Sequence, residues 1–318
     1  MQSRREDVTL SLMERDASQS CHARRRPGPV VLRRLPEGWR PHVYERIRIT
    51  PAAATLGAYV EGVDLSQPMD AQLFEELDRA LLEWKVLFFR NQPLSIEAHA
   101  AFAARWGPLF DDHLIIKRHE NPAEAVVVYE RNEETVGLEN EWHCDGSFRT
   151  EVPMGTVLRA IEVPDLCGDT LFADMAAAWD DLPEALKERV QDLRAVHDWS
   201  LGAYAEKYGE QLAELRLAVP PVEQPVVRRH PVTGRNTLFV NRLFTREILG
   251  VTPQESEALL ERLCAQADLP ELQCRLRWEP GTIAFWDNNA VQHYGANDYW
   301  PQRRVMARAS IERREIHA

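Results

Sequence analysis

Short runs of alternating or continuous apolar residues, separated by Pro, Asp and Gly, fill most of the chain from about residue 44 onward. Residues 45–50 (ERIRIT) alternate as a half-buried strand does, and residues 86–92 (VLFFRNQ) form the apolar run of a buried strand. Other β-type runs lie at residues 57–66, 125–130, 155–163, 169–175, 272–288 and 304–312. The run at 272–288 divides into two strands around a Pro280-Gly281 turn.

Four segments carry apolar residues at helical spacing instead. This spacing predicts helices over residues 70–85, 95–107 and 176–193, and a fourth helix that begins at Thr252. There Thr252 and Glu255 have the spacing of a capping box. Many short strands with few helices, and no alternation of strand and helix, predict a mainly β fold decorated with helices.

The first 43 residues differ from the rest of the chain. They are rich in Arg, Ser and Pro and show no sustained hydrophobic period. We expect an N-terminal extension over residues 1–43 that is flexible or lies on the surface, followed by one domain over residues 44–318. The three arginines at 24–26 leave an anion-binding arm or a targeting segment as alternatives, although acidic residues nearby disfavour targeting.

Composition and charge narrow the classes of partner. The chain has 318 residues, 44% of them hydrophobic and 8% aromatic, which is typical of a folded globular protein. Its net charge of −12 argues against nucleic-acid binding and favours a small organic substrate. No apolar run has the length of a membrane span. The five cysteines include no CxxC pair, and this cysteine pattern favours a reducing cytoplasm. A homo-oligomer is compatible with the sequence.

A His-x-Asp pair supplies the candidate chemistry. His143 and Asp145, in EWHCDGSF, project from the same face of an extended segment, so one strand end can present both to a metal ion. His293, in AVQHYGANDY, is the candidate for the third ligand. Two imidazoles and one carboxylate are the ligand set of mononuclear non-haem Fe(II) oxygenases. Because His293 lies far downstream, the fold has to bring it back to the pair, as a closed or double-layered β structure does.

Two arginines near the C-terminus form a second constellation. Arg304 and Arg308 lie on one face of the predicted last strand, whose other positions are largely apolar. If that face points inward, both guanidinium groups require anionic partners to offset their desolvation. A 2-oxo acid cosubstrate offers such a carboxylate, whereas a solvated strand edge is the alternative.

With these motifs in place, the chain resembles the taurine dioxygenase and 2,4-dichlorophenoxyacetate dioxygenase family of Fe(II)/2-oxoglutarate-dependent oxygenases. The resemblance extends from about residue 44 to residue 312. The segments that carry it are GAYVEGVDLS, VLFFRNQPLS, EWHCDGSF, PMGTVLRAIEVPDLCGDTLFADM, RRHPVTGRNTLFVN and GTIAFWDNNAVQHYGANDYWPQRRVMARAS.

The resemblance implies a fold, cofactors and residue roles. The fold would be a double-stranded β-helix (jelly-roll) core flanked by α-helices, and the reaction would use Fe(2+), 2-oxoglutarate and O2. His143, Asp145 and His293 match the iron ligands. Thr170 and Arg304 match the residues that bind the distal carboxylate of 2-oxoglutarate. Arg308 matches an arginine that reaches the substrate anion or the near end of the cosubstrate.

The segment before the metal motif departs from the pattern of the taurine enzymes. An ungapped alignment puts Asp112 where those enzymes carry a substrate-binding histidine, and His113 reaches that place only with a one-residue shift. Since an aspartate repels a sulfonate, we expect a dioxygenase that oxidises a C–H bond of another small organic molecule, either an anion or a neutral compound. A taurine, alkyl-sulfonate or sulfate-ester dioxygenase, a non-catalytic sensor of metal and 2-oxoglutarate, and a zinc or manganese jelly-roll protein stay open as alternatives.

Overall fold

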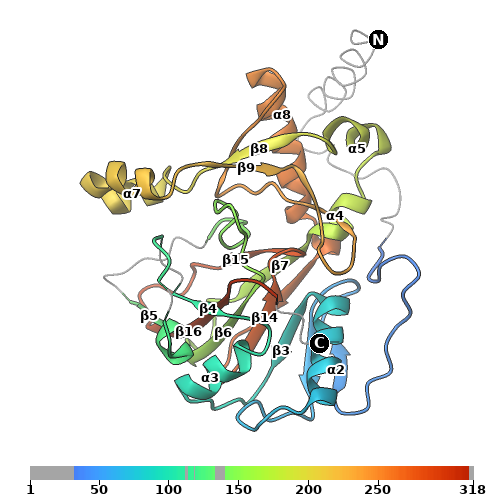
Figure 1. Ribbon diagram of the computed structural model, residues 1–318, viewed down its shortest axis with the longest axis vertical. Helices are drawn as coiled ribbons and strands as arrows, with labels where there is room; N and C mark the ends of the chain where they lie inside the picture. The colour runs from blue at the N-terminus through green and yellow to red at the C-terminus, as the bar shows by residue number, and fades with distance from the viewer. Residues whose placement is uncertain (1–31, 112–113, 118, 133–139, 315–318) are drawn as a thin grey trace.

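A large, mostly antiparallel sheet forms the base of the protein (Figure 1). The computed structural model describes residues 32–111, 114–117, 119–132 and 140–314. Across the sheet the strands follow the order β1 (Arg48–Pro51), β2 (Ala58–Glu61), β3 (Val86–Phe89), β14 (Ile283–Asp287), β6 (Gly155–Glu162), β16 (Arg304–Ile311) and β4 (Leu109–Phe110), and β5 (Val127–Arg131) also pairs with β16.

A second, three-stranded sheet faces the first and completes a jelly roll. Its order is β13 (Gln273–Leu276), β7 (Thr170–Asp174) and β15 (Val291–Gly295), all antiparallel. An apolar cluster fills the space between the sheets, with Phe172 from the small sheet packed 5.5 Å from Trp286 of the large one, ring centroid to centroid. The predicted mainly β fold with a jelly-roll core and flanking helices is confirmed.

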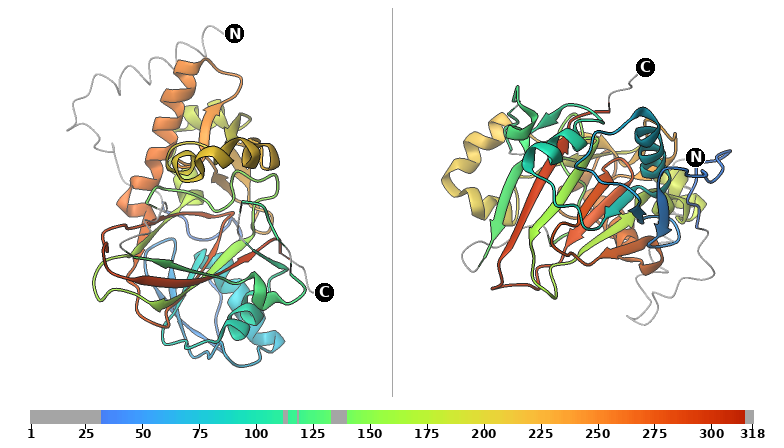
Figure 2. Two further views of the ribbon diagram at one scale, coloured as in Figure 1. Left: turned by 90° about the vertical axis from the view of Figure 1, so that its left-hand side faces the viewer. Right: turned by 90° about the horizontal axis from the view of Figure 1, so that it is seen from below.

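Alternation along the strands of the large sheet separates two cores. In β14, Ile283 and Phe285 point to one core, while Ala284 and Trp286 point to the cluster between the sheets. The outer core is covered by α2 (Ala71–Trp84) and α3 (Ile96–Ala103), which both lie in the lower half of Figure 1. The right-hand view of Figure 2 shows both helices on the same side of the sheet strands.

Local sequence signals set the helix ends. Asp70 caps α2 by accepting a hydrogen bond from the Leu73 amide, and Thr252 caps α8 (Pro253–Cys264) by accepting from the Glu255 amide.

The helix predicted over 176–193 is wrong as one element. It divides into α4 (Met175–Asp180) and α5 (Glu184–Val190), because Pro183 lacks the amide that a continuous helix needs.

A third layer lies above the jelly roll in Figure 1. It combines α4, α5 and α8 with a sheet of β12 (Thr245–Ile248), β8 (Arg194–His197) and β9 (Val222–Pro225), around a second apolar core. A hairpin of β10 (Val227–Arg229) and β11 (Asn236–Leu238) packs against α4. Between β8 and β9 the chain makes an excursion through α6 (Ala203–Tyr208) and α7 (Leu212–Ala218), neither of which contains a fully buried residue.

None of the helices within the described ranges has the length and apolar character that a membrane crossing requires. The N-terminal extension is described only from residue 32, so the prediction for residues 1–31, including the three arginines, lies outside the described residues.

Candidate metal centre

The structure brings the three candidate ligands together. His143 forms an isolated β-bridge with His293 of β15: its amide donates to the His293 carbonyl at 3.1 Å, and the His293 amide donates back at 2.9 Å. The potential ligand atoms of His143, Asp145 and His293 all lie within 4.8 Å of one another, and the three side chains are buried. The predicted strand end at 143–145 contracts to this single bridge, because Asp145 already begins a turn.

Hydrogen bonds fix which atoms face the centre. The Nδ1 of His143 lies 2.7 Å from the Glu141 carbonyl oxygen and donates to it, which leaves the Nε2 lone pair for a metal. The Nε2 atoms of His143 and His293 lie 3.8 and 3.5 Å from Oδ1 of Asp145. The two imidazoles and one carboxylate oxygen therefore converge on a common point.

The other oxygen of Asp145 is held away from that point. Thr156 of β6 donates its hydroxyl to Oδ2 at 2.9 Å, and the Arg308 guanidinium of β16 contacts the same oxygen at 2.9 Å. With Oδ2 engaged twice, Oδ1 alone is left to coordinate. One oxygen and two nitrogens occupy one face of a metal and leave other positions open.

Electrostatics keep the ligands in their coordinating forms. Burial raises the pKa of Asp145, but the Arg308 guanidinium, the two imidazoles and the Thr156 hydrogen bond outweigh it and hold that pKa below its usual range. Burial, with His143 nearby, lowers the pKa of His293 to about 3. Asp145 is therefore ionised and His293 neutral at physiological pH, as metal ligands need to be.

Cys144, between two candidate ligands, points elsewhere. Its thiol donates to the Asn288 carbonyl at 3.1 Å, and burial raises its pKa, so the group stays a neutral thiol. The turn that follows requires Gly146, which has φ 61°, and a Cβ there would lie 2.7 Å from Pro153. The hydrogen bond of Cys144 and the tight turn at Gly146 together fix the path of the chain around Asp145.

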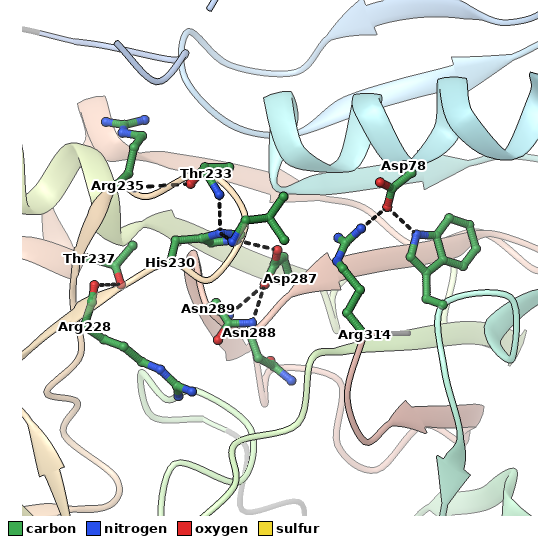
Figure 3. Close-up of polar contacts among 12 residues, drawn as sticks. Asp78, Arg228, His230, Thr233, Arg235, Thr237, Asp287, Asn288, Asn289 and Arg314 are labelled. Carbon is green, nitrogen blue, oxygen red and sulfur yellow. Dashed lines mark hydrogen bonds and ion pairs between the residues drawn. The ribbon is translucent and has the colours of Figure 1, made fainter. Parts of the chain in front are cut away.

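A buried network fixes the β14–β15 turn that leads to His293 (Figure 3). His230 accepts from the amides of Val232 and Thr233 at Nδ1, so its Nε2 carries a proton and donates to Asp287 at 2.9 Å. Burial raises the pKa of Asp287, but His230, with Arg314 and the Asn289 amide, outweighs burial and lowers that pKa to about 2. The other oxygen of Asp287 accepts from the Asn289 amide. The network ties the β10–β11 hairpin to the turn.

Arg304 and Thr170 lie at the start of their strands, β16 and β7. Arg304 is buried, its guanidinium carbon 5.6 Å from the ring centre of Tyr299, and its Nε has no hydrogen-bond partner. It pairs with no carboxylate among the residues that the structure describes. Thr170 is buried and hydrogen-bonds Trp278 at 2.9 Å. The inward orientation that the sequence left conditional for Arg304 is the observed one.

Aromatic residues border the His143 side of the centre. The ring of Phe244 lies 6.1 Å from that of His143, 4.8 Å from Phe148 and 6.0 Å from Tyr204 of α6. The half-buried Arg308 is the cation among the candidate substrate contacts. Asp112 and His113, the other two, lie outside the described residues.

Sequence reasoning did not identify Thr156, Glu141 or Trp278. Thr156 and Trp278 lie on β-type runs that were predicted, but nothing in the pattern shows that their polar atoms turn toward Asp145 and Thr170. Glu141 acts through its carbonyl, which no side-chain motif reveals.

Comparisons with known proteins identify the family of the chain. The model of the "Taurine catabolism dioxygenase TauD, TfdA family" matches residues 48–310. An alpha-ketoglutarate-dependent sulfate ester dioxygenase from Pseudomonas putida is 32% identical over 85% of this chain and 91% of its own. An alpha-ketoglutarate-dependent 2,4-dichlorophenoxyacetate dioxygenase from Cupriavidus pinatubonensis is 32% identical over 82% of this chain and 96% of its own.

Among solved structures, a taurine dioxygenase from Burkholderia xenovorans is similar with a TM-score of 0.72 and 33% identity, over 85% of this chain and 92% of that one. The family model covers most of the chain, and the relatives align over nearly their full length. This chain belongs to the TauD, TfdA family of dioxygenases.

Proposed function

We propose that the protein is an Fe(II)- and 2-oxoglutarate-dependent dioxygenase in which His143, Asp145 and His293 hold the iron. The observation that carries this assignment is the convergence of two Nε2 atoms and one carboxylate oxygen within 4.8 Å. The donor set fits the metal, because two imidazoles and a single carboxylate oxygen suit Fe(II) and leave coordination positions open. Cys144 agrees with this assignment, since its thiol donates a hydrogen bond to the Asn288 carbonyl and offers the metal no thiolate.

Arg304 and Thr170 are proposed to bind the distal carboxylate of 2-oxoglutarate. A buried guanidinium is stabilised by an anion that satisfies its donors, and Arg304 has no carboxylate partner within the described part of the chain. With the metal bound, O2 and 2-oxoglutarate are consumed, succinate and CO2 are released, and one oxygen atom enters a substrate C–H bond. The protein binds, orients and shields the reactants.

The substrate is proposed to be a small anion with an apolar body. Arg308 supplies a cation beside Asp145, and the Phe148, Phe244 and Tyr204 rings supply an apolar wall next to His143. A sulfate ester or an aryloxy carboxylate combines both features, as the names of the two curated relatives indicate for those proteins. Taurine lacks the apolar body.

The test is succinate formation with a panel of alkyl sulfates, aryloxy carboxylates, alkyl sulfonates and taurine, each with and without O2. We expect O2-dependent succinate with at least one anion that has an apolar body, and much less with taurine. His143→Ala is expected to abolish turnover. Binding of metal and 2-oxoglutarate without any O2 consumption would favour the non-catalytic sensor, and purification with tightly bound zinc would favour the hydrolytic or structural alternative.

We further propose one catalytic domain over residues 44–318, preceded by an extension over 1–43, that works in the reducing cytoplasm without nucleic-acid or membrane partners. The four cysteines that the structure describes are all unpaired, which agrees with such a compartment. Self-association into a homo-oligomer is compatible with the fold, and light scattering of the purified protein measures it.

A further inference from the structure

Trp278 connects the two residues proposed to hold the distal carboxylate of the cosubstrate. It follows β13 in the chain and is buried between the two sheets. Its indole Nε1 donates to the Thr170 hydroxyl oxygen at 2.9 Å, and its ring centre lies 6.0 Å from the guanidinium carbon of Arg304. One side chain therefore touches both groups.

The hydrogen bond from Trp278 determines what the Thr170 hydroxyl can do. An indole N–H only donates, so it occupies a lone pair of the Thr170 oxygen and leaves the hydroxyl proton to donate elsewhere. Among the described residues no acceptor takes that proton. A hydroxyl fixed as a donor suits an anionic carboxylate and not a group that itself donates.

The rings of Trp278 and Tyr299 also fix the Arg304 guanidinium. Its carbon lies 6.0 and 5.6 Å from the two ring centres, which are distances of cation–π contact. Gly168 allows Tyr299 to lie there, because a Cβ at residue 168 would come within 3.2 Å of the Tyr299 ring. Arg304 is thus held in place before any ligand binds.

We propose that Trp278 is a positioning residue for the distal carboxylate of the 2-oxo acid: it fixes Thr170 as a hydrogen-bond donor and holds Arg304 beside it. The inference rests on the proposed function and adds a residue to it. Trp278 acts through its two neighbours and takes no part in the chemistry at the metal. Its loss should weaken only ligands that carry a distal carboxylate.

Binding without turnover tests this proposal. Isothermal titration calorimetry with Mn(II)-loaded protein, without O2, compares 2-oxoglutarate with 2-oxovalerate, which has the same chain length but no distal carboxylate. Trp278→Phe keeps an aromatic ring near Arg304 and removes the N–H donor. We expect its Kd for 2-oxoglutarate to rise about tenfold, equivalent to about 1.4 kcal/mol, with the Kd for 2-oxovalerate unchanged.

A matched control is Trp106→Phe. Trp106, which follows α3, is also buried, and its Nε1 donates to Asp78 of α2 at 2.8 Å in the outer core. This variant loses a comparable hydrogen bond and should bind both 2-oxo acids as the wild type does. Any general effect of removing a buried indole N–H will appear in it.

A double-mutant cycle with Thr170→Val tests whether Trp278 acts through Thr170. We expect Trp278→Phe to weaken 2-oxoglutarate binding much less in the Thr170→Val background than in the wild type. The inference is overturned if Trp278→Phe binds 2-oxoglutarate as tightly as the wild type does, or if it loses equal affinity for 2-oxovalerate. It is also overturned if the effects of Trp278→Phe and Thr170→Val on 2-oxoglutarate binding are fully additive. If Trp278→Phe does not fold, Thr170→Val alone still decides, because wild-type discrimination between the two acids in that variant contradicts it.

The two proposals fail in different ways. If the Mn(II)-loaded wild type binds no 2-oxoglutarate, the proposed function is wrong. If the wild type binds it and Trp278→Phe binds it equally well, only the role of Trp278 is wrong.

Discussion

Replacing Thr156 by valine should weaken metal binding while leaving the fold intact. The Thr156 hydroxyl donates to Oδ2 of Asp145 at 2.9 Å from a fully buried position, and valine has nearly the same shape without the donor. A hydrogen bond to a charged group contributes about 1.5–3 kcal/mol. Converted at about 1.4 kcal/mol per tenfold, that range is about 10- to 100-fold in affinity, which is also the usual effect of losing a group that orients a metal ligand.

The lower end of this range is expected, because Arg308 still holds the same oxygen at 2.9 Å. We therefore predict that Thr156→Val raises the Kd for Mn(II) about tenfold, measured by electron paramagnetic resonance of free Mn(II) in an anaerobic titration. The control is Thr237→Val, which removes another buried hydroxyl that donates to the Arg228 carbonyl at 3.0 Å. In urea, Thr237→Val should lose about 1 kcal/mol of unfolding free energy, and Thr156→Val, whose hydroxyl bonds a charged carboxylate, should lose about 1.5–3 kcal/mol.

Only Thr156→Val should lose metal affinity. Wild-type affinity for Mn(II) in that variant would show that Oδ2 of Asp145 needs no orientation, and the reasoning about a single coordinating oxygen would fail. Equal losses of affinity in both variants would attribute the effect to general loosening of the core.

Three further outcomes are expected. Arg304→Met should raise the Kd for 2-oxoglutarate about 100-fold in the Mn(II)-loaded protein, measured by calorimetry, and leave 2-oxovalerate binding unchanged; equal effects on both acids would contradict its assignment. Arg308→Gln should raise the KM for an anionic substrate more than the KM for 2-oxoglutarate in succinate assays, and the reverse order would move Arg308 to the cosubstrate. His230→Gln should destabilise the protein in urea by more at pH 6 than at pH 3. His230 is the largest of the groups that lower the pKa of Asp287 from 3.8 to about 2 on folding, so the stability that it contributes is complete above the unfolded pKa and is lost as pH falls toward 2. A pH-independent difference would contradict the pairing of these two groups.

The hydrophobic pattern predicted many of the strands and a mainly β fold with helices, and the family resemblance implied the jelly roll. The apolar runs of β3 and β14 and the β-type run of β16 reflect burial on both faces of one sheet, which a local pattern records. The chain between residues 194 and 250 was not predicted in detail. Its strands are short, and α6 and α7 contain no fully buried residue, so their apolar positions carry little periodicity.

Some residues of the candidate site could also be predicted from the sequence, and others could not. His143-x-Asp145 is local, so the sequence reveals it. The sequence also offered His293 and Arg304 as candidates, and the family resemblance implied their roles. The contacts that orient these residues were not predictable, because Thr156 and Trp278 meet their partners only after the sheets pair. The helix predicted over 176–193 failed for a local reason, because Pro183 interrupts it.

The most direct test of the central claim is an anaerobic titration of the protein with Fe(II) and 2-oxoglutarate, followed by visible absorption. If His143, Asp145 and His293 hold the iron and leave room for the 2-oxo acid to chelate it, a weak visible charge-transfer band will appear in the wild type and be absent in His143→Ala. The absence of a band in the wild type, or an equal band in His143→Ala, would contradict the assignment of the metal centre.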